Sequence, residues 1–146
     1  MKRILALDVG LRRIGLALSD PLGITAQGME TLQRRNLRTD LAILQRLAAE
    51  HEVSLFVVGD PLHMSGDASR QGALVREFAG QLEERCGLPV QLWDERLTTV
   101  EANRVLRSSG ISQEKRAKAV DRLSAVLILQ SYLDALPGAN EWPGEE

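Results

Sequence analysis

The sequence is poor in the residues on which several functional classes depend. Aromatic residues make up only 3% of its 146 residues, too few for the base-stacking surfaces typical of single-strand-binding proteins. Cysteine occurs once, at Cys86, and histidine twice, which argues against an internal disulfide and against a cysteine–histidine zinc site. No apolar run approaches membrane-spanning length, and no basic-then-apolar leader opens the chain. These absences predict a cytoplasmic protein.

Length and charge set broad limits on organisation. A chain of this size with 44% hydrophobic and 26% charged residues is expected to form one globular domain, here over residues 1–137. The remaining residues, 138–146, carry three acids and no base, and we expect them to form a flexible acidic tail. The whole chain has a net charge of −2, and without those three acids it would have +1. Net charge therefore does not exclude a nucleic-acid partner.

The hydrophobic pattern predicts the order of strands and helices. Asn36 is a good N-cap for a helix in which leucines recur at helical spacing. The expected elements are strands near 3–9, 14–20 and 26–32, a helix over 37–50, a strand over 55–59, a helix over 70–85, a strand over 89–93, a short helix from about 98 to 110, and a last helix from between 113 and 119 to 136. This order predicts a single α/β domain of the ribonuclease-H-like class, with a mixed five-stranded sheet (three antiparallel strands, then two parallel) flanked by helices.

A carboxylate, Asp8, stands near the end of the first apolar strand. Removing an ionised carboxylate from water is costly unless it is paired or binds a metal ion. One interpretation is a turn cap acting through Gly10; the other is a functional ligand.

A second acidic pair, Asp94 and Glu95, follows the fifth expected strand and precedes Arg96. Adjacent side chains of an extended chain point to opposite faces, so only one of the two carboxylates can meet Asp8. Ligands of open α/β sheets bind at these carboxyl ends. The alternative is a solvated turn with a surface ion pair.

The last helix carries a third inward carboxylate, Asp121. It lies four residues after Ala117 and seven before Ile128, and so belongs to the apolar stripe of this helix. Alternatively, it sits at the edge of the stripe and pairs with Lys118 or Arg122.

Three converging carboxylates would repel one another strongly. Two like charges 4 Å apart cost about 4 kcal/mol at an effective dielectric constant of 20. Mg²⁺ or Mn²⁺ would make the same cluster favourable, because both ions prefer oxygen ligands. Such a centre suits two-metal hydrolysis of a phosphodiester bond.

Five motifs, in order, resemble the YqgF/RuvX family of Holliday-junction-resolvase-like nucleases over residues 3 to about 136. They are Leu7-Asp8-Val9-Gly10, Arg13-Ile14-Gly15-Leu16-Ala17 with Ser19-Asp20, Val57-Val58-Gly59 with Pro61-Leu62, Met64 and Gly66, Asp94-Glu95-Arg96-Leu97-Thr98-Thr99, and Val120-Asp121 with Leu123, Ala125 and Leu127-Ile128-Leu129-Gln130.

The resemblance implies a ribonuclease-H-like fold and a metal-dependent nuclease that matures the 5′ end of pre-16S ribosomal RNA. It also implies that Asp8, Glu95 and Asp121 are catalytic residues and metal ligands, with Mg²⁺ or Mn²⁺ as the cofactor. The alternatives are a junction-resolving DNA endonuclease and a non-catalytic nucleic-acid-binding module. The oligomeric state, monomer or homodimer, stays open.

The chain departs from the family pattern at two positions. Asp60 ends the central strand where relatives often have an apolar or amide residue, so it could be a fourth metal ligand; a Gly-Asp-Pro turn is the simpler explanation. Ser124 replaces a common alanine, which is a small-for-small change.

Three cations near the acidic positions, Arg13, Arg96 and Lys118, are candidate substrate-binding residues. Guanidinium and ammonium groups hold phosphate oxygens through charge-assisted hydrogen bonds. Ion pairing with the acidic cluster is the alternative.

Overall fold

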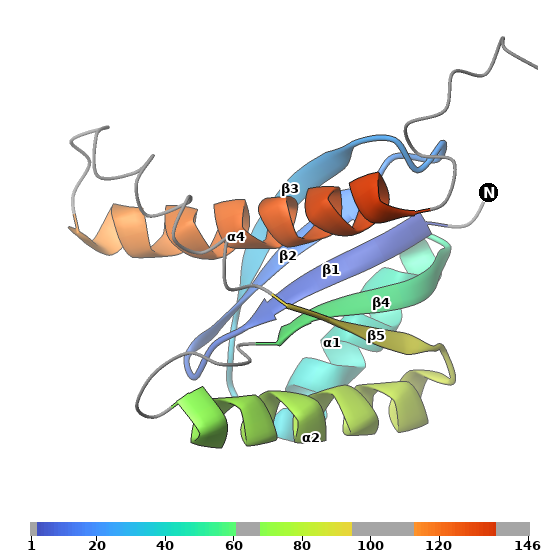
Figure 1. Cartoon of the computed structure of the whole chain (residues 1–146). Helices are drawn as coiled ribbons and strands as arrows, with labels where there is room; N and C mark the ends of the chain where they lie inside the picture. Colours follow the sequence, from blue (N-terminus) through green and yellow to red (C-terminus); the bar gives the residue numbers. More distant parts are fainter. Residues whose placement is uncertain (1–2, 61–67, 95–112, 137–146) are drawn as a thin grey trace, which may run out of the picture.

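The structure is a computed structural model that describes residues 3–60, 68–94 and 113–136, with residues 68–71 and 113–121 described by their backbone alone. Its elements are, in order, β1 (Arg3–Val9), β2 (Arg13–Ser19), β3 (Ala26–Gln33), α1 (Leu37–Glu50), β4 (Val53–Asp60), α2 (Ala68–Cys86), β5 (Val90–Asp94) and α4 (Gln113–Ala135) (Figure 1).

The five strands form one mixed sheet in the order β3-β2-β1-β4-β5. β1 pairs antiparallel with β2, and β2 pairs antiparallel with β3. β4 lies parallel to β1, and β5 lies parallel to β4. The predicted sheet is confirmed, and β1, β4 and β5 all end at the same edge.

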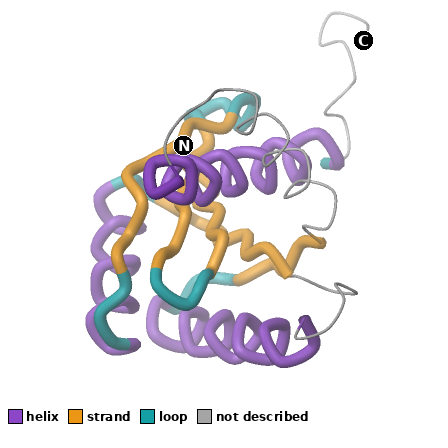
Figure 2. Tube along the Cα trace, turned by 90° about the vertical axis from the view of Figure 1, so that its left-hand side faces the viewer, coloured by secondary structure: helices purple, strands orange, loops and turns teal. Residues whose placement is uncertain are grey.

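Helices cover both faces of the sheet. α4 lies on one face, and α1 and α2 lie on the other (Figures 1 and 2). Side chains of β1 alternate between two cores: Leu5 and Leu7 pack in the core under α1 and α2, and Ala6 packs in the core under α4. β4 alternates in the same way, with Val58 on the α1/α2 side and Val57 on the α4 side. Burial on both faces explains the continuous apolar runs of these strands.

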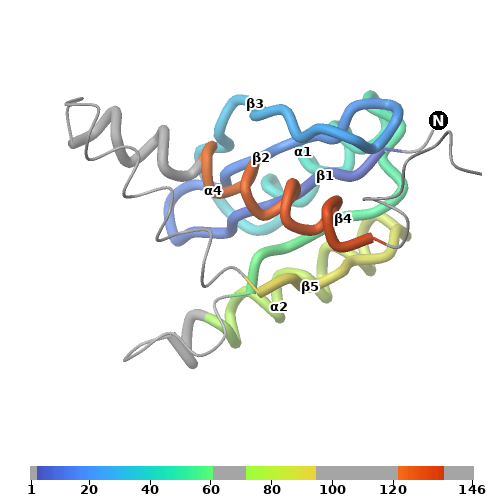
Figure 3. The backbone as a smooth tube through the Cα atoms, turned by 45° about the horizontal axis from the view of Figure 1, so that its top comes forward, coloured from blue at the N-terminus to red at the C-terminus, as the bar shows by residue number. Residues whose placement is uncertain are grey.

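A row of small residues brings α4 close to the sheet. Ala6 of β1 stands opposite Ala17 of β2, which stands opposite Gly28 of β3. A Cβ on Gly28 would lie 2.8 Å from Cγ of Arg122. The helix therefore lies directly across these strands (Figure 3), and its register on the sheet depends on their small side chains.

Most predicted boundaries agree with the structure within two residues. α1 covers residues 37–50 as predicted, and the Asn36 side chain accepts a hydrogen bond of 2.9 Å from the backbone N–H of Thr39. β4 is longer than predicted at both ends, and it includes Asp60. α4 begins at Gln113, the earliest of the predicted starts. The predicted helix over 98–110 and the acidic tail lie outside the described residues.

Among the helices in the described ranges, none is long and apolar enough to cross a membrane.

Asp20 gives the loop between β2 and β3 a pH-dependent stability. Its Oδ1 accepts hydrogen bonds from the backbone N–H groups of Thr25 at 2.9 Å and Ile24 at 2.7 Å. These hydrogen bonds, chiefly the one from Thr25, lower the pKa of Asp20 below its ordinary value of 3.8. The stabilisation is therefore present above pH 3.8 and disappears as the pH falls through the lowered value.

We expect Asp20→Asn to be less stable than the parent protein at pH 7 and equally stable once Asp20 is protonated. Urea unfolding over this pH range measures the difference. Glu50→Gln, at an exposed helix end, is the control and should show no such convergence. A constant gap between Asp20→Asn and the parent protein at all pH values would contradict the assignment.

Candidate active site

Asp8 lies at the edge where the parallel strands end, between two glycines. It stands opposite Gly15 on β2. On its other side it lies one residue beyond the Leu7–Val58 pair, which places it beside Gly59 on β4. The Asp8 side chain is half-buried. Glycines within strands often mark a place where a ligand approaches closely, and here they flank one carboxylate on both sides.

The alternation of β1 places Asp8 on the α4 face of the sheet. Ala6 packs under α4, Leu7 packs under α1 and α2, and Asp8 follows on the side of Ala6. By the same alternation Arg13 lies on this face, because it precedes the core residue Ile14 of β2. Asp8 and the candidate phosphate contact Arg13 are thus brought to the same face by the β1–β2 hairpin.

Trp93 fixes the end of β5 to α4. Its indole N–H donates a hydrogen bond of 3.0 Å to Oγ of Ser131, and its ring packs edge-on against Tyr132 with the centroids 5.2 Å apart. Asp94 follows on the opposite face, the side of Leu92, and is exposed. Of the predicted acidic pair, Asp94 is therefore the residue that turns away from Asp8.

The structure describes the other predicted site residues only in part. Glu95 and Arg96 lie outside the described residues. Lys118 and Asp121 belong to the backbone of α4, and their side chains are not described. Asp121 comes three residues before Ser124, which is buried against the sheet, so its helical spacing is that of the inward stripe.

Asp60 lies on the opposite face from Asp8. It is 2% exposed, and its two oxygens accept hydrogen bonds of 3.3 and 3.4 Å from Nη1 of Arg76 on α2. Its Cα stands opposite that of Asp94, which also faces α2. Asp60 therefore forms an ion pair with Arg76 on the α2 side of the sheet.

The donor chemistry at Asp8 fits a hard divalent cation. Its carboxylate oxygens are the ligand type that Mg²⁺ and Mn²⁺ prefer. The described side chains, those of residues 3–60, 72–94 and 122–136, include no group of three acidic, histidine or cysteine residues placed to hold a metal ion. The predicted cluster depends on Glu95 and on the Asp121 side chain.

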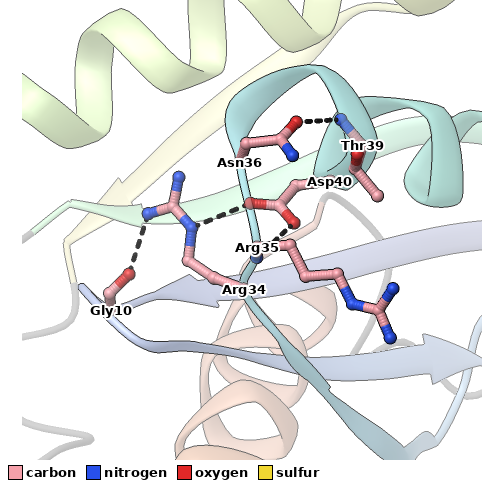
Figure 4. Close-up of polar contacts among 6 residues, drawn as sticks. All are labelled: Gly10, Arg34, Arg35, Asn36, Thr39 and Asp40. Carbon is pink, nitrogen blue, oxygen red and sulfur yellow. Dashed lines mark hydrogen bonds and ion pairs between the residues drawn. The ribbon is translucent and has the colours of Figure 1, made fainter.

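A second buried ion pair, which the sequence analysis did not predict, supports the hairpin that follows Asp8 (Figure 4). Asp40 is 0% exposed, and its Oδ2 lies 3.2 Å from Nε of Arg34. Its Oδ1 accepts a hydrogen bond of 3.1 Å from the backbone N–H of Arg35. Arg34 also donates from Nη1 to the carbonyl oxygen of Gly10 at 2.9 Å. A signal was present in the sequence, because Asp40 precedes Leu44 by four residues and so lies on the inward stripe of its helix.

Ser124 carries a buried hydroxyl that has no hydrogen-bond partner within the described residues. An unsatisfied buried polar group costs about 1–3 kcal/mol. Ser124→Ala should therefore raise the free energy of unfolding by about 1 kcal/mol, since the methyl group fills nearly the same space. Urea unfolding measures this change; a loss of stability would show that the hydroxyl has a partner.

A family model described as "RuvX: Holliday junction resolvase" matches residues 2–135. The chain belongs to the RuvX family. Two of its curated relatives carry the provisional name pre-16S rRNA nuclease. The relative from Koribacter versatilis is 61% identical over 132 residues, which are 90% of this chain and 86% of that relative. The relative from Moorella thermoacetica is 51% identical over 134 residues, 92% of this chain and 96% of that relative. Family membership, predicted from the five motifs, is confirmed.

Solved structures of RuvC share the fold of this RuvX-family chain. Thermus thermophilus RuvC bound to a Holliday junction matches with a TM-score of 0.58 and 13% identity, over 92% of this chain and 95% of that one. Another structure of the same RuvC matches with a TM-score of 0.54 and 11% identity, over 91% and 95%. At this identity the likeness concerns the fold alone, and it confirms the predicted ribonuclease-H-like class.

Proposed function

We propose that this RuvX-family nuclease is a divalent-metal-dependent phosphodiester hydrolase that acts in 5′-end maturation of pre-16S ribosomal RNA, in the cytoplasm. The observation that carries the proposal is the position of Asp8, flanked by Gly15 and Gly59 at the edge where three parallel strands end. The names of the curated relatives support the RNA substrate.

Asp8, Glu95 and Asp121 are the proposed catalytic residues and metal ligands. Asp94 turns toward α2, so the residue after it in an extended chain is the one expected on the face of Asp8; Glu95 holds that place in the sequence. α4 covers this face, and its inward spacing includes Asp121. The proposal therefore assigns one ligand to each of β1, the end of β5, and α4.

When bound, Mg²⁺ or Mn²⁺ would lower the pKa of a water molecule and neutralise charge on the scissile phosphate. The protein's own residues have simpler roles. Asp8, Glu95 and Asp121 would hold the cation. Arg13, on the same face, together with Arg96 and Lys118, would orient the phosphate backbone through charge-assisted hydrogen bonds.

A DNA-junction endonuclease is the second candidate. The family model is described as a Holliday junction resolvase, and the same three carboxylates would serve either substrate, since a metal centre contacts the phosphate and not the sugar. A non-catalytic binding module is disfavoured because all three acidic positions are present.

Cleavage of two substrates by the purified protein in Mg²⁺ or Mn²⁺ distinguishes these candidates. The substrates are a pre-16S RNA with its 5′ leader and a four-way DNA junction. We expect cleavage in the RNA leader that stops when the metal is chelated. Cleavage of the junction alone would favour the second candidate. Binding of either substrate without cleavage would favour a module without catalysis.

Arg13→Gln should weaken binding of the RNA and of the DNA junction to a similar extent, because phosphate contacts position a substrate without reading its sequence. Loss of one such contact should reduce the slope of log affinity against log salt by about 1. Fluorescence anisotropy at several salt concentrations measures the slope. Arg46→Gln, on the exposed side of α1, is the control. An unchanged slope for Arg13→Gln would remove this residue from the interface.

A further inference from the structure

The Arg34 side chain contacts the hairpin that follows Asp8 from the side of the sheet that α2 covers. Residues 10–12 connect β1 to β2. The Gly10 N–H donates to the carbonyl oxygen of Arg13 at 2.9 Å, which closes the turn. A Cβ on Gly10 would lie 2.9 Å from that oxygen, so the turn is tight. The Gly10 carbonyl accepts from Arg34 Nη1 at 2.9 Å, and the Arg34 backbone N–H donates to the carbonyl oxygen of Arg12 at 2.9 Å.

Packing contributes little to holding the tip of this hairpin, residues 10–12. A cavity of about 270 Å³ separates it from α2, and its lining includes Val9, Gly10 and Leu11 on one side and Leu74 and Phe78 on the other. The Leu11 side chain at the tip is 79% exposed. Because apolar contact is sparse here, the position of the tip depends on its hydrogen bonds.

Arg34 itself is fixed on three sides. Its Nε lies 3.2 Å from Oδ2 of Asp40, whose side chain is 1% exposed. Its guanidinium lies 5.2 Å from the centre of the Phe78 ring on α2, within the range of a cation–π contact. Figure 4 shows the guanidinium between Gly10 and Asp40. A charged, forked donor with so little freedom is suited to hold one carbonyl oxygen in place.

We propose that Arg34, oriented by Asp40, is a positioning residue for Asp8. Its bond to the Gly10 carbonyl fixes the chain two residues after Asp8, from the face opposite to the carboxylate, and so sets where that carboxylate stands. This inference rests on the proposed role of Asp8 as a metal ligand. Arg34 itself touches neither the metal nor the substrate.

Two variants separate positioning from general stability. Arg34→Met alone would leave the buried Asp40 charge without its cation and could unfold the protein. Asp40→Asn combined with Arg34→Met removes the charge and the tether together. Asp40→Asn alone is the matched control: it removes the same buried charge, but it keeps the Arg34 side chain as a donor to Gly10 and an acceptor for the Arg35 N–H.

Hydrogen exchange in the absence of metal tests the tether. We expect the Gly10 amide to exchange about tenfold faster in the double variant than in Asp40→Asn, as for loss of one hydrogen bond from a charged donor. The amide of Ala6, in the middle of β1, should not differ between the two variants. Equal protection of Gly10 in both variants would overturn the proposal.

The affinity for Mn²⁺ tests whether Arg34 positions Asp8. It is measured from the decrease in the EPR signal of free Mn²⁺ as the ion binds. The double variant should bind Mn²⁺ at least tenfold more weakly than Asp40→Asn, as expected when support of a metal ligand is lost. Equal affinity combined with faster Gly10 exchange would overturn the positioning role. If the parent protein binds no Mn²⁺, the proposed metal-dependent function is wrong, and Arg34 cannot position a metal ligand. The exchange rate of the Gly10 amide still decides whether Arg34 holds the turn.

Discussion

Asp8→Asn is expected to abolish cleavage while leaving the fold intact. A metal ion at a phosphodiester contributes several kcal/mol of transition-state stabilisation, and a loss of about 4 kcal/mol lowers the rate roughly a thousandfold. If Asp8, Glu95 and Asp121 converge as proposed, the variant should be as stable as the parent protein, or slightly more stable in the absence of metal, because replacing a carboxylate with an amide relieves like-charge repulsion.

Single-turnover cleavage at saturating Mn²⁺, together with thermal unfolding without metal, measures both effects. Glu30→Gln, on the exposed edge strand β3, is the control and should cleave at the parental rate. Cleavage by Asp8→Asn within a few-fold of the parent would exclude Asp8 from the chemistry. A large loss of stability would instead give it a structural role.

Arg76→Met is expected to cause a marked loss of stability, although a smaller one than Arg34→Met, because Arg76 is more exposed than Arg34. It would leave Asp60 buried, with no partner for either oxygen among the described residues. Breaking a fully buried pair costs about 3–5 kcal/mol. Because the Arg76 side chain is 43% exposed, water can partly replace it, and we expect a loss of about 2 kcal/mol in the free energy of unfolding.

Asp60→Asn supplies the second half of this test. It removes the buried charge, so it should destabilise less than Arg76→Met, and the Mn²⁺ concentration for half-maximal cleavage should not change. Arg46→Met, at an exposed pair with Glu50 whose atoms are 4.0 Å apart, should cost less than about 0.5 kcal/mol. A sharply increased metal requirement in Asp60→Asn would restore Asp60 as a ligand.

The fold was largely predictable because local signals and long-range packing agree. The apolar runs of β1 and β4 are long enough to be buried on both faces, and Asn36 caps α1 through its side chain as its position in the sequence indicates. Small residues at Ala6, Ala17 and Gly28 let α4 lie across the sheet. Each of these choices points to the same sheet with helices on both faces.

The face to which each acidic residue turns was harder to predict. A strand that is apolar on both faces shows no alternation in its sequence, so nothing local indicates that Asp60 faces α2 while Asp8 faces α4. The β4 strand also includes Asp60, so Asp60 is a strand residue and its face is set by the register of the sheet. Only the register of β1, β4 and β5 assigns these side chains to faces.

Inward helical spacing of a carboxylate likewise does not identify its role. Asp40 in α1 and Asp121 in α4 both occupy apolar stripes at helical spacing. Asp40 is buried against Arg34 and the Arg35 backbone, and its role is structural. Asp121 is distinguished by the family motif around it and by its helix, which covers the face that Asp8 occupies. The helical spacing of apolar residues alone does not distinguish Asp40 from Asp121.

The most direct test of the proposed active site is a crystal structure with Mn²⁺, in which anomalous scattering identifies the ion. We expect a peak at a metal–ligand distance of about 2.1 Å from a carboxylate oxygen of Asp8, with Glu95 and Asp121 completing the protein ligands. An ion bound elsewhere, or an Asp121 carboxylate too distant to reach an ion at Asp8, would contradict this expectation.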